Sequence, residues 1–204
     1  FVSIGERGFR TYQKMKKAGA SGVLFRFETS NPNLFKKFHP NGKNLKNRLN
    51  HLGFLKNLGY FIATGSLIGL PGQTINDLVD DILLIKKYAH MVSLGPFLPT
   101  NNTPLVDAPN DGKTKQWKIE MNLKMIAVLR LLKKTSRIPV ITALETLAGP
   151  DIRPKALQSG ANSLMFNLTP AKYRPYYKIY DHKFYQQENI WEKYGLFKEK
   201  DSFE

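Results

Sequence analysis

The sequence contains no cysteine among its 204 residues. Disulfide bonds and thiolate-ligated metal sites are therefore excluded within these residues, and the absence favours a reducing compartment. No apolar run is long enough to span a bilayer, so no membrane partner is expected. The length fits one domain with a buried core.

Several motifs that would identify a common enzyme class are also missing. No GxGxxG follows a strand and no GxxxxGK(S/T) is present, which weakens the dinucleotide-binding and P-loop interpretations. The four histidines have no metal-ligand spacing such as HExxH. No Ser/His/Asp set and no convincing pair of acids supports a hydrolase. The sequence therefore predicts neither a metal site nor a catalytic residue of its own.

Acidic residues are scarce, since 31 Lys and Arg face 16 Asp and Glu, for a formal net charge of +15. The lysines come in pairs, such as Lys16-Lys17 and Lys86-Lys87, mostly near the ends or polar faces of predicted helices. There they complement helix dipoles and keep the surface hydrated. We interpret the charge as a lysine-rich background, with nucleic-acid binding as the less favoured alternative.

The most informative stretch runs from residue 60 to residue 99. Residues 61–70 form an almost unbroken apolar run, typical of a strand buried on both faces. Pro71 and Gly72 end it, and Thr74 is suited to cap a helix. A second buried run, 91–98, is again closed by proline. The pattern predicts a βαβ unit with parallel strands and a right-handed crossover.

The whole chain alternates strands with helices, which predicts a parallel α/β sheet. Residues 30–44 are expected to be a polar connection. The number of predicted strands, six, suggests a partial (βα)8 TIM-type barrel over residues 1–180 that contains strands three to eight. Residues 181–204 are expected to form a C-terminal tail. The predicted strands lie near 1–6, 22–29, 60–70, 91–98, 138–147 and 163–168.

In such a barrel, function lies at the carboxyl ends of the strands. Arg26 and Glu28 are two residues apart on one predicted strand, so their side chains share a face. They could form a structural ion pair at the rim. Alternatively, Glu28 could accept from a ligand ammonium while an arginine, such as Arg48, clamps a carboxylate. Spacing alone leaves the two interpretations even.

The motifs FRFETSNP, NRLN, GSLIGLPGQT, SLGPFLPTNNTPL and SGANSLMFNLTPAKYRPYY carry a family resemblance. Over residues 1 to about 180 the chain resembles radical S-adenosylmethionine (SAM) enzymes of the biotin synthase-like group, and among them the HydE-type FeFe-hydrogenase maturases. The resemblance implies a (βα)8 barrel whose first strand precedes a CxxxCxxC loop that holds a 4Fe–4S cluster. SAM bound to that cluster would be cleaved to a 5′-deoxyadenosyl radical.

Where the motifs of the family match this sequence, the resemblance implies which residues form the site. By this assignment, Ser3, Glu28 and Arg48 would contact SAM. The residues implied to line the substrate cavity are Arg26, Met91, Thr142 and Tyr177.

Three departures accompany the resemblance. The cluster-binding cysteines are absent, so we expect a fragment whose cluster segment precedes Phe1 and which is inactive alone. Ile141-Thr142 replaces two adjacent threonines, and the tail is short and free of cysteine.

The expected function is hydrogenase active-site maturation, with a small-molecule substrate and other maturation proteins as partners, in the cytoplasm or a hydrogen-producing organelle. The alternatives are methylornithine synthase-like or biotin synthase-like chemistry, or a cluster-less barrel that serves as a binding or scaffold protein.

Overall fold

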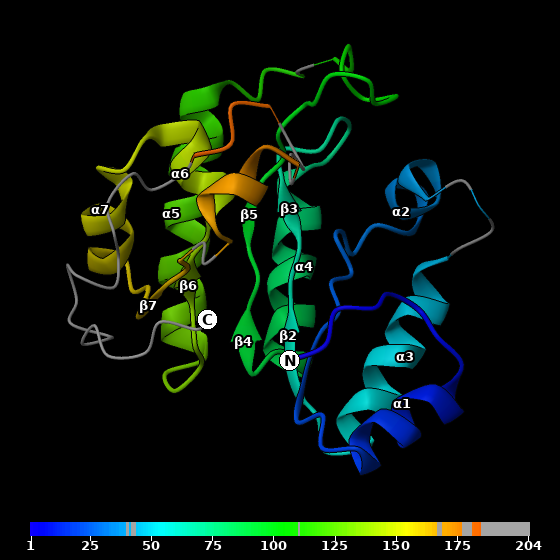
Figure 1. Cartoon of the computed structure of the whole chain (residues 1–204). Coiled ribbons are helices and arrows are strands. Elements are labelled where there is room, and N and C mark those ends of the chain that lie inside the picture. Colours follow the sequence, from blue (N-terminus) through cyan, green and yellow to red (C-terminus); the bar gives the residue numbers. More distant parts are fainter. Residues whose placement is uncertain (40, 42–43, 110, 167–168, 177–180, 185–204) are drawn as a thin grey trace, which may run out of the picture.

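The structure is a computed structural model that describes residues 1–184 except 40, 42–43, 110, 167–168 and 177–180. Parallel strands form its centre, with helices packed along them (Figure 1). The strands are β1 (Gly22–Leu24), β2 (Phe61–Thr64), β3 (Leu67–Ile68), β4 (Met91–Val92), β5 (Gly95–Pro96), β6 (Pro139–Val140) and β7 (Ser163–Leu164).

Every described pairing between strands is parallel. The sheets run β1-β2-β4, β3-β5 and β6-β7. Isolated bridges extend them, joining Val2 to Val23, Glu28 to Ser66 and Met91 to Arg137. Six chain segments thus lie side by side in space in the same order as in the sequence. This arrangement confirms the predicted parallel α/β architecture. None of the three sheets closes into a ring within the described residues.

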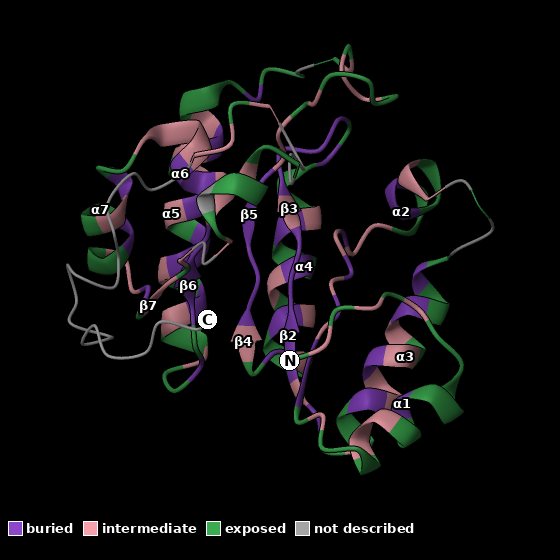
Figure 2. Ribbon diagram, viewed as in Figure 1, coloured by how far each residue is buried: buried purple, intermediate pink, exposed green. Residues whose placement is uncertain are grey.

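The helices supply the outer layer. Figure 1 shows α4 and α5 behind the strands, α1 to α3 on one side and α6 and α7 on the other. Purple strands and inner helix faces in Figure 2 mark the core between them. None of the described helices could span a membrane. The helices are α1 (Phe9–Lys17), α2 (Pro32–Phe38), α3 (Leu45–Asn57), α4 (Ile75–Tyr88), α5 (Lys115–Leu132), α6 (Thr142–Ala148), α7 (Ile152–Gln158) and the 3-10 helix η1 (Ala171–Tyr176).

The predicted βαβ unit is present as β2, α4 and β4. A capping box starts α4: the Thr74 hydroxyl accepts from the Asp77 N–H at 3.1 Å, and the Asp77 carboxylate accepts from the Thr74 N–H at 2.7 Å. Two orphan donors of the first turn are thereby satisfied. Leu78 and Ile85 are buried on the inner face of α4.

Two predicted elements are wrong. The strand expected over 138–147 ends at Val140, and α6 begins at Thr142. Its sequence, TALETLA, is apolar enough to resemble a buried strand, but Ala, Leu and Glu favour a helix. The connection expected over 30–44 contains α2, where the Asn31 side chain caps the first turn and Pro32 occupies the first position. Asn-Pro is a helix-start signal that the polar composition obscured.

The long strands at 60–70 and 91–98 are each interrupted at mid-length, between β2 and β3 and between β4 and β5. The two backbones approach closely there. A Cβ at Gly65 would lie 2.1 Å from the carbonyl oxygen of Ser93. Only glycine fits this position, which also borders the candidate site.

Candidate functional site

The strand that carries Arg26 and Glu28 has a bulge at the candidate site. The N–H groups of Phe27 and Glu28 both donate to the carbonyl of Gly65, at 3.3 and 3.2 Å. Glu28 then takes a left-handed backbone conformation, with φ of 66°, and bridges to Ser66. This conformation costs a non-glycine residue about 1–2 kcal/mol. Bulges and strained residues are concentrated near functional sites, so Glu28 becomes the main candidate.

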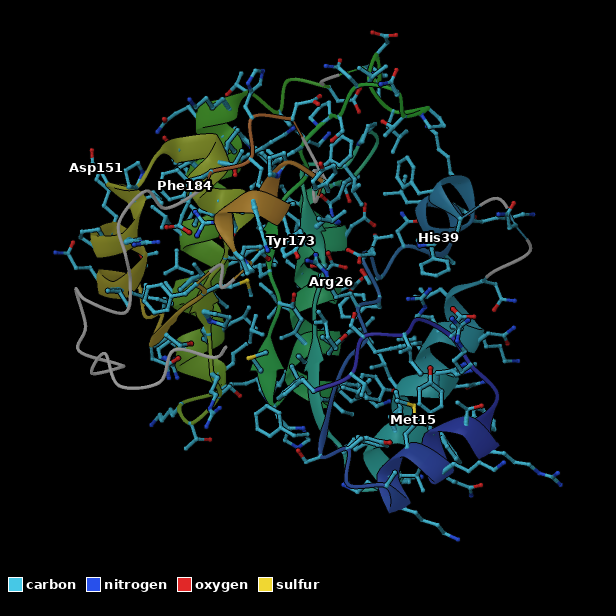
Figure 3. The ribbon with its side chains drawn as sticks, in the orientation of Figure 1. Met15, Arg26, His39, Asp151, Tyr173 and Phe184 are labelled. Atoms are coloured by element: carbon cyan, nitrogen blue, oxygen red, sulfur yellow. The ribbon has the colours of Figure 1, made fainter. Side chains whose placement is uncertain are left out.

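Arg26 and Glu28, which follow the end of β1, form an ion pair, one of the two interpretations that their spacing left open. The nearest nitrogen and oxygen are 3.0 Å apart, and the guanidinium also donates to the Ser66 carbonyl at 2.8 Å. The ion-pair contact lacks hydrogen-bond alignment: Arg26 Nε and Glu28 Oε2 are both buried with no hydrogen-bond partner among the described residues. Figure 3 shows Arg26 over the middle of the strands. The pair therefore retains unused hydrogen-bonding capacity.

Arg48 joins this pair to the N-terminal segment. Its Nε donates to Glu6 Oε1 at 2.7 Å, and a terminal nitrogen donates to the carbonyl of Arg26 at 2.8 Å. The guanidinium carbon lies 4.7 Å from the centroid of the Phe25 ring and 5.6 Å from that of Phe35. Only 9% of Arg48 is exposed. It is thus an internal charged group rather than a solvated helix charge.

The segment after Glu28 is anchored to α4 by two acids. The Ser30 N–H donates to Asp81 Oδ1 at 2.6 Å, and the Ser30 hydroxyl donates to the Asp77 carbonyl at 2.9 Å. Asn31 adds an amide hydrogen bond to the Asp77 carboxylate at 2.9 Å. The helix therefore fixes the backbone two residues beyond the strained position.

Asp81 is fully buried, and burial raises its pKa from an ordinary 3.8 to about 6, against the opposing effect of the Ser30 hydrogen bonds. Sequence reasoning missed this residue. A signal did exist, since Asp81 lies on the same helical face as the buried Leu78 and Ile85.

The remaining predicted residues are dispersed. Ser3 is exposed beside the Val2 bridge. Thr142 starts α6 just past the carboxyl end of β6, where its carbonyl accepts from the Thr146 hydroxyl. Tyr177 lies outside the described residues.

Met91, which the resemblance implies to line the cavity, is the first residue of β4, so it lies at the amino end of that strand and not at a carboxyl end, where function was expected. Met91 pairs with Ala63, which in turn pairs with Leu24. Direct partners share a face, so Met91 is on the face that carries Leu24 and Arg26.

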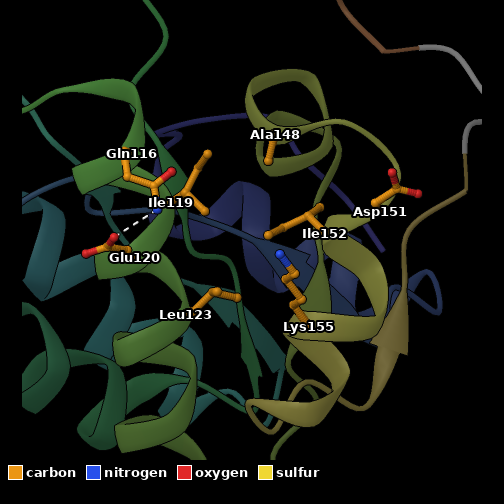
Figure 4. A pocket seen from close by; sticks show the side chains of 8 residues that line it. All are labelled: Gln116, Ile119, Glu120, Leu123, Ala148, Asp151, Ile152 and Lys155. Carbon is orange, nitrogen blue, oxygen red and sulfur yellow. Dashed lines mark hydrogen bonds between the residues drawn. The ribbon is translucent and has the colours of Figure 1, made fainter.

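A separate cavity of about 230 Å³ lies between α5 and the α6–α7 corner (Figure 4). None of the predicted site residues lines it, so it is not the candidate site. Within the described residues, no group of three or more His, Asp or Glu could hold a metal ion. The lining residues are Gln116, Ile119, Glu120, Leu123, Ala148, Asp151, Ile152 and Lys155.

Comparison with known proteins agrees with this architecture. No protein-family model matches the chain. The [FeFe] hydrogenase maturase subunit HydE of Thermotoga maritima is 44% identical over 183 residues, 89% of this chain and 50% of HydE. The 3-methylornithine synthase of Methanosarcina barkeri is 30% identical over 173 residues, 83% of this chain and 45% of that protein.

A crystal structure of methylornithine synthase (PylB) matches with a TM-score of 0.67 and 28% identity, covering 79% of this chain and 45% of that one. The chain belongs to the biotin synthase-like group of radical SAM proteins. Within that group it is a homologue of the hydrogenase maturase HydE. It spans about half the length of the curated relatives it matches.

Proposed function

We propose that the chain is part of a HydE-type radical SAM maturase that acts in assembling the active-site cofactor of FeFe hydrogenase, together with other maturation proteins. The observation that carries the proposal is the 44% identity to HydE across 89% of the chain. The proposed architecture is strands three to eight of a (βα)8 barrel. Six parallel segments in sequence order support it.

The SAM-contacting residues in this proposal are Ser3, Glu28 and Arg48. SAM carries an ammonium and a carboxylate on its methionine part, and Glu28 Oε2, which faces the Arg26 guanidinium at 3.0 Å, is a buried acceptor without an aligned hydrogen bond in the described structure. An ammonium donor would satisfy it. Arg48 fits a carboxylate less directly, because two of its nitrogens already donate to Glu6 and Arg26.

The proposed cavity lining consists of Arg26, Met91, Thr142 and Tyr177. The unpaired Nε of Arg26 supports a polar substrate near the ion pair, since a buried donor gains most from an acceptor in a site closed to water. Of the four, Arg26 has the strongest support.

Bound SAM would accept one electron from a reduced 4Fe–4S cluster, and cleavage of a C–S bond would then supply a carbon-centred radical and leave methionine. The sequence has no cysteine, so the cluster ligands would come from outside these 204 residues. This chain by itself is therefore expected to bind SAM without cleaving it.

Calorimetric titration of SAM into the chain tests the site. We expect Glu28→Gln, which removes the charge and keeps the shape, to weaken binding about 10-fold or more, as loss of a charge-assisted hydrogen bond should. Glu120→Gln, an exposed acid on α5, is the matched control. Unchanged affinity in Glu28→Gln, or no SAM binding by the unmodified chain, would contradict the proposed site.

The maturation role is tested with the natural gene in a host whose HydE-type maturase has been deleted. Recovery of hydrogenase activity supports the proposal. Formation of 3-methylornithine or biotin in the matching deletion hosts would instead favour one of those enzymes, to which the chain is 30% and 29% identical. Binding without product in every host would favour a scaffold protein.

A further inference from the structure

Among the residues that the structure describes, one end of the molecule is formed by chain segments that contain no acidic residue. Helices that follow parallel strands run back along them, so their C-terminal ends collect at the amino ends of the strands. The five chain segments that turn at this end are residues 13–24, 53–63, 82–92, 130–140 and 156–164, and none contains Asp or Glu. In Figure 1 the lower ends of α1, α3, α4 and α5 lie along this side of the molecule.

The same end carries a dense group of cations, which we call the basic end. Like charges crowd one another within it. Burial lowers the pKa of Lys133, and the charges of Lys56 and Lys86 lower it further. The basic end comprises Lys16, Lys17, Lys56, Lys86, Lys87, Lys133, Lys134 and Arg137.

Only some of these cations can be explained by their interaction with helix C-termini. Three lysines cap carbonyls at this end: Lys16 donates to Gly59 at 2.8 Å, Lys56 to Lys87 at 2.9 Å and Lys133 to Lys86 at 3.1 Å.

The other lysines of the three doublets have no such bond. Lys17, Lys86, Lys87 and Lys134 are exposed. None of them takes part in an ion pair among the described residues. An ordinary hydrated surface mixes both signs, because unrelieved repulsion disfavours the compact state.

We propose that the basic end is a docking surface for a protein partner whose own surface carries clustered Asp and Glu side chains. The positive charge is complementary to such a surface and would steer the partner to it. The basic end lies at the amino ends of the strands, whereas Glu28 follows the carboxyl end of β1. A docked partner would therefore leave the Glu28 site open.

A carboxylate-bearing protein fits better than a nucleic acid. Single-stranded nucleic acids bind to exposed aromatic rings on which bases stack, combined with a groove of positive charge. At the basic end Tyr60 is only 2% exposed, and Phe61 packs against His90 and Phe1 at centroid distances of 5.2 and 5.6 Å. Phe1 itself is 64% exposed, but a single open ring is not the row of stacking rings that a single strand uses. The cations are mostly lysines, which act as point charges rather than as bidentate phosphate forks.

The test compares two triple variants that each remove three positive charges. The first variant changes Lys17, Lys87 and Lys134 to Gln, which alters the basic end and keeps the lysines that cap carbonyls. The second variant, the control, changes Lys36, Lys115 and Lys124, which are exposed lysines elsewhere on the protein, to Gln. Binding of poly-L-glutamate and of a single-stranded RNA oligonucleotide is measured for both, and carbodiimide cross-links to poly-L-glutamate are mapped by mass spectrometry.

We expect the basic-end variant to lose about 10-fold in poly-L-glutamate affinity at low salt, as three weak surface pairs would predict, and the control to change little. Cross-links should concentrate on Lys17, Lys86, Lys87 and Lys134. Equal losses in both variants, dispersed cross-links, or tighter binding of RNA than of poly-L-glutamate would overturn the proposal. Because SAM titration of the basic-end variant should match the unmodified chain, this result is independent of the proposed function.

Discussion

The buried carboxylate of Asp81 makes the stability of this protein depend on pH in a way that can be calculated. Its pKa is raised from 3.8 to about 6 in the folded state, chiefly by burial. A raised folded-state pKa means that the unfolded chain gives up this proton first as pH rises. The native state is therefore favoured most below about pH 3.8, and it loses stability as pH rises through about 6.

The size of the effect follows from the same two values. The rise in pKa corresponds to about 3 kcal/mol once Asp81 is ionised in both states. Between about pH 4.5 and about pH 8, the linkage relation assigns about 2 kcal/mol of that loss to Asp81. Asp81→Asn removes the ionisation and keeps an oxygen that can accept from the Ser30 N–H.

Urea unfolding of both proteins at these two pH values is the assay. We expect the unfolding free energy of Asp81→Asn, relative to the unmodified chain, to rise by about 2 kcal/mol from the lower to the higher pH. Asp80→Asn, at an exposed position on the same helix, should show no such trend. A pH-independent difference for Asp81→Asn would refute the reasoning, because it would mean that the carboxylate is not desolvated.

Three further predictions concern the backbone around the site. Thr74→Ala should lower the unfolding free energy by about 1 kcal/mol in urea titration, since it removes the α4 cap. Gly65→Ala should cost more than about 3 kcal/mol or prevent folding, as judged by circular dichroism, because its Cβ would lie 2.1 Å from a Ser93 oxygen. Glu28→Gly should raise the free energy of unfolding by about 1 kcal/mol, since glycine relieves the left-handed backbone strain. The same change should weaken SAM binding, because it removes the proposed carboxylate acceptor. A Glu28→Gly protein that is less stable than the unmodified chain would show that the ion pair outweighs the strain.

The βαβ unit could be predicted because its signals are local. Two apolar runs, a Pro-Gly stop and a Thr-x-x-Asp cap lie within forty residues and agree with one another. The wrong predictions concern residues whose local sequence pattern suits two kinds of secondary structure. Residues 142–148 are apolar in a way that suits a strand or a helix, and only the packing of α6 against α5 and β5 decides between them.

The candidate site also has features that could be predicted from the sequence and features that could not. The contact between Arg26 and Glu28 is one of two interpretations of their two-residue spacing, so the sequence could bring these residues forward without deciding their role. The pairing of Arg48 with Glu6 joins residues 42 positions apart, and it arises only when α3 packs beside the N-terminal segment. The bulge at Glu28 could not be predicted either, because it depends on how the Gly65 carbonyl is presented by a neighbouring strand.

Two costs to stability meet at the segment after β1, one at Glu28 and the other at Asp81, which binds Ser30 two residues further on. Glu28 holds a strained backbone, at about 1–2 kcal/mol, and Ser30 is bound by a carboxylate whose burial costs about 3 kcal/mol at neutral pH. An uncharged hydrogen-bond acceptor at position 81 would anchor Ser30 without that loss. Adjacent unfavourable features of this kind persist where geometry serves binding rather than stability. This is the physical reason for centring the proposed SAM site on Glu28 rather than on the exposed Ser3, and the Asp81→Asn protein, if more stable at neutral pH yet weaker in binding SAM, would demonstrate the exchange directly.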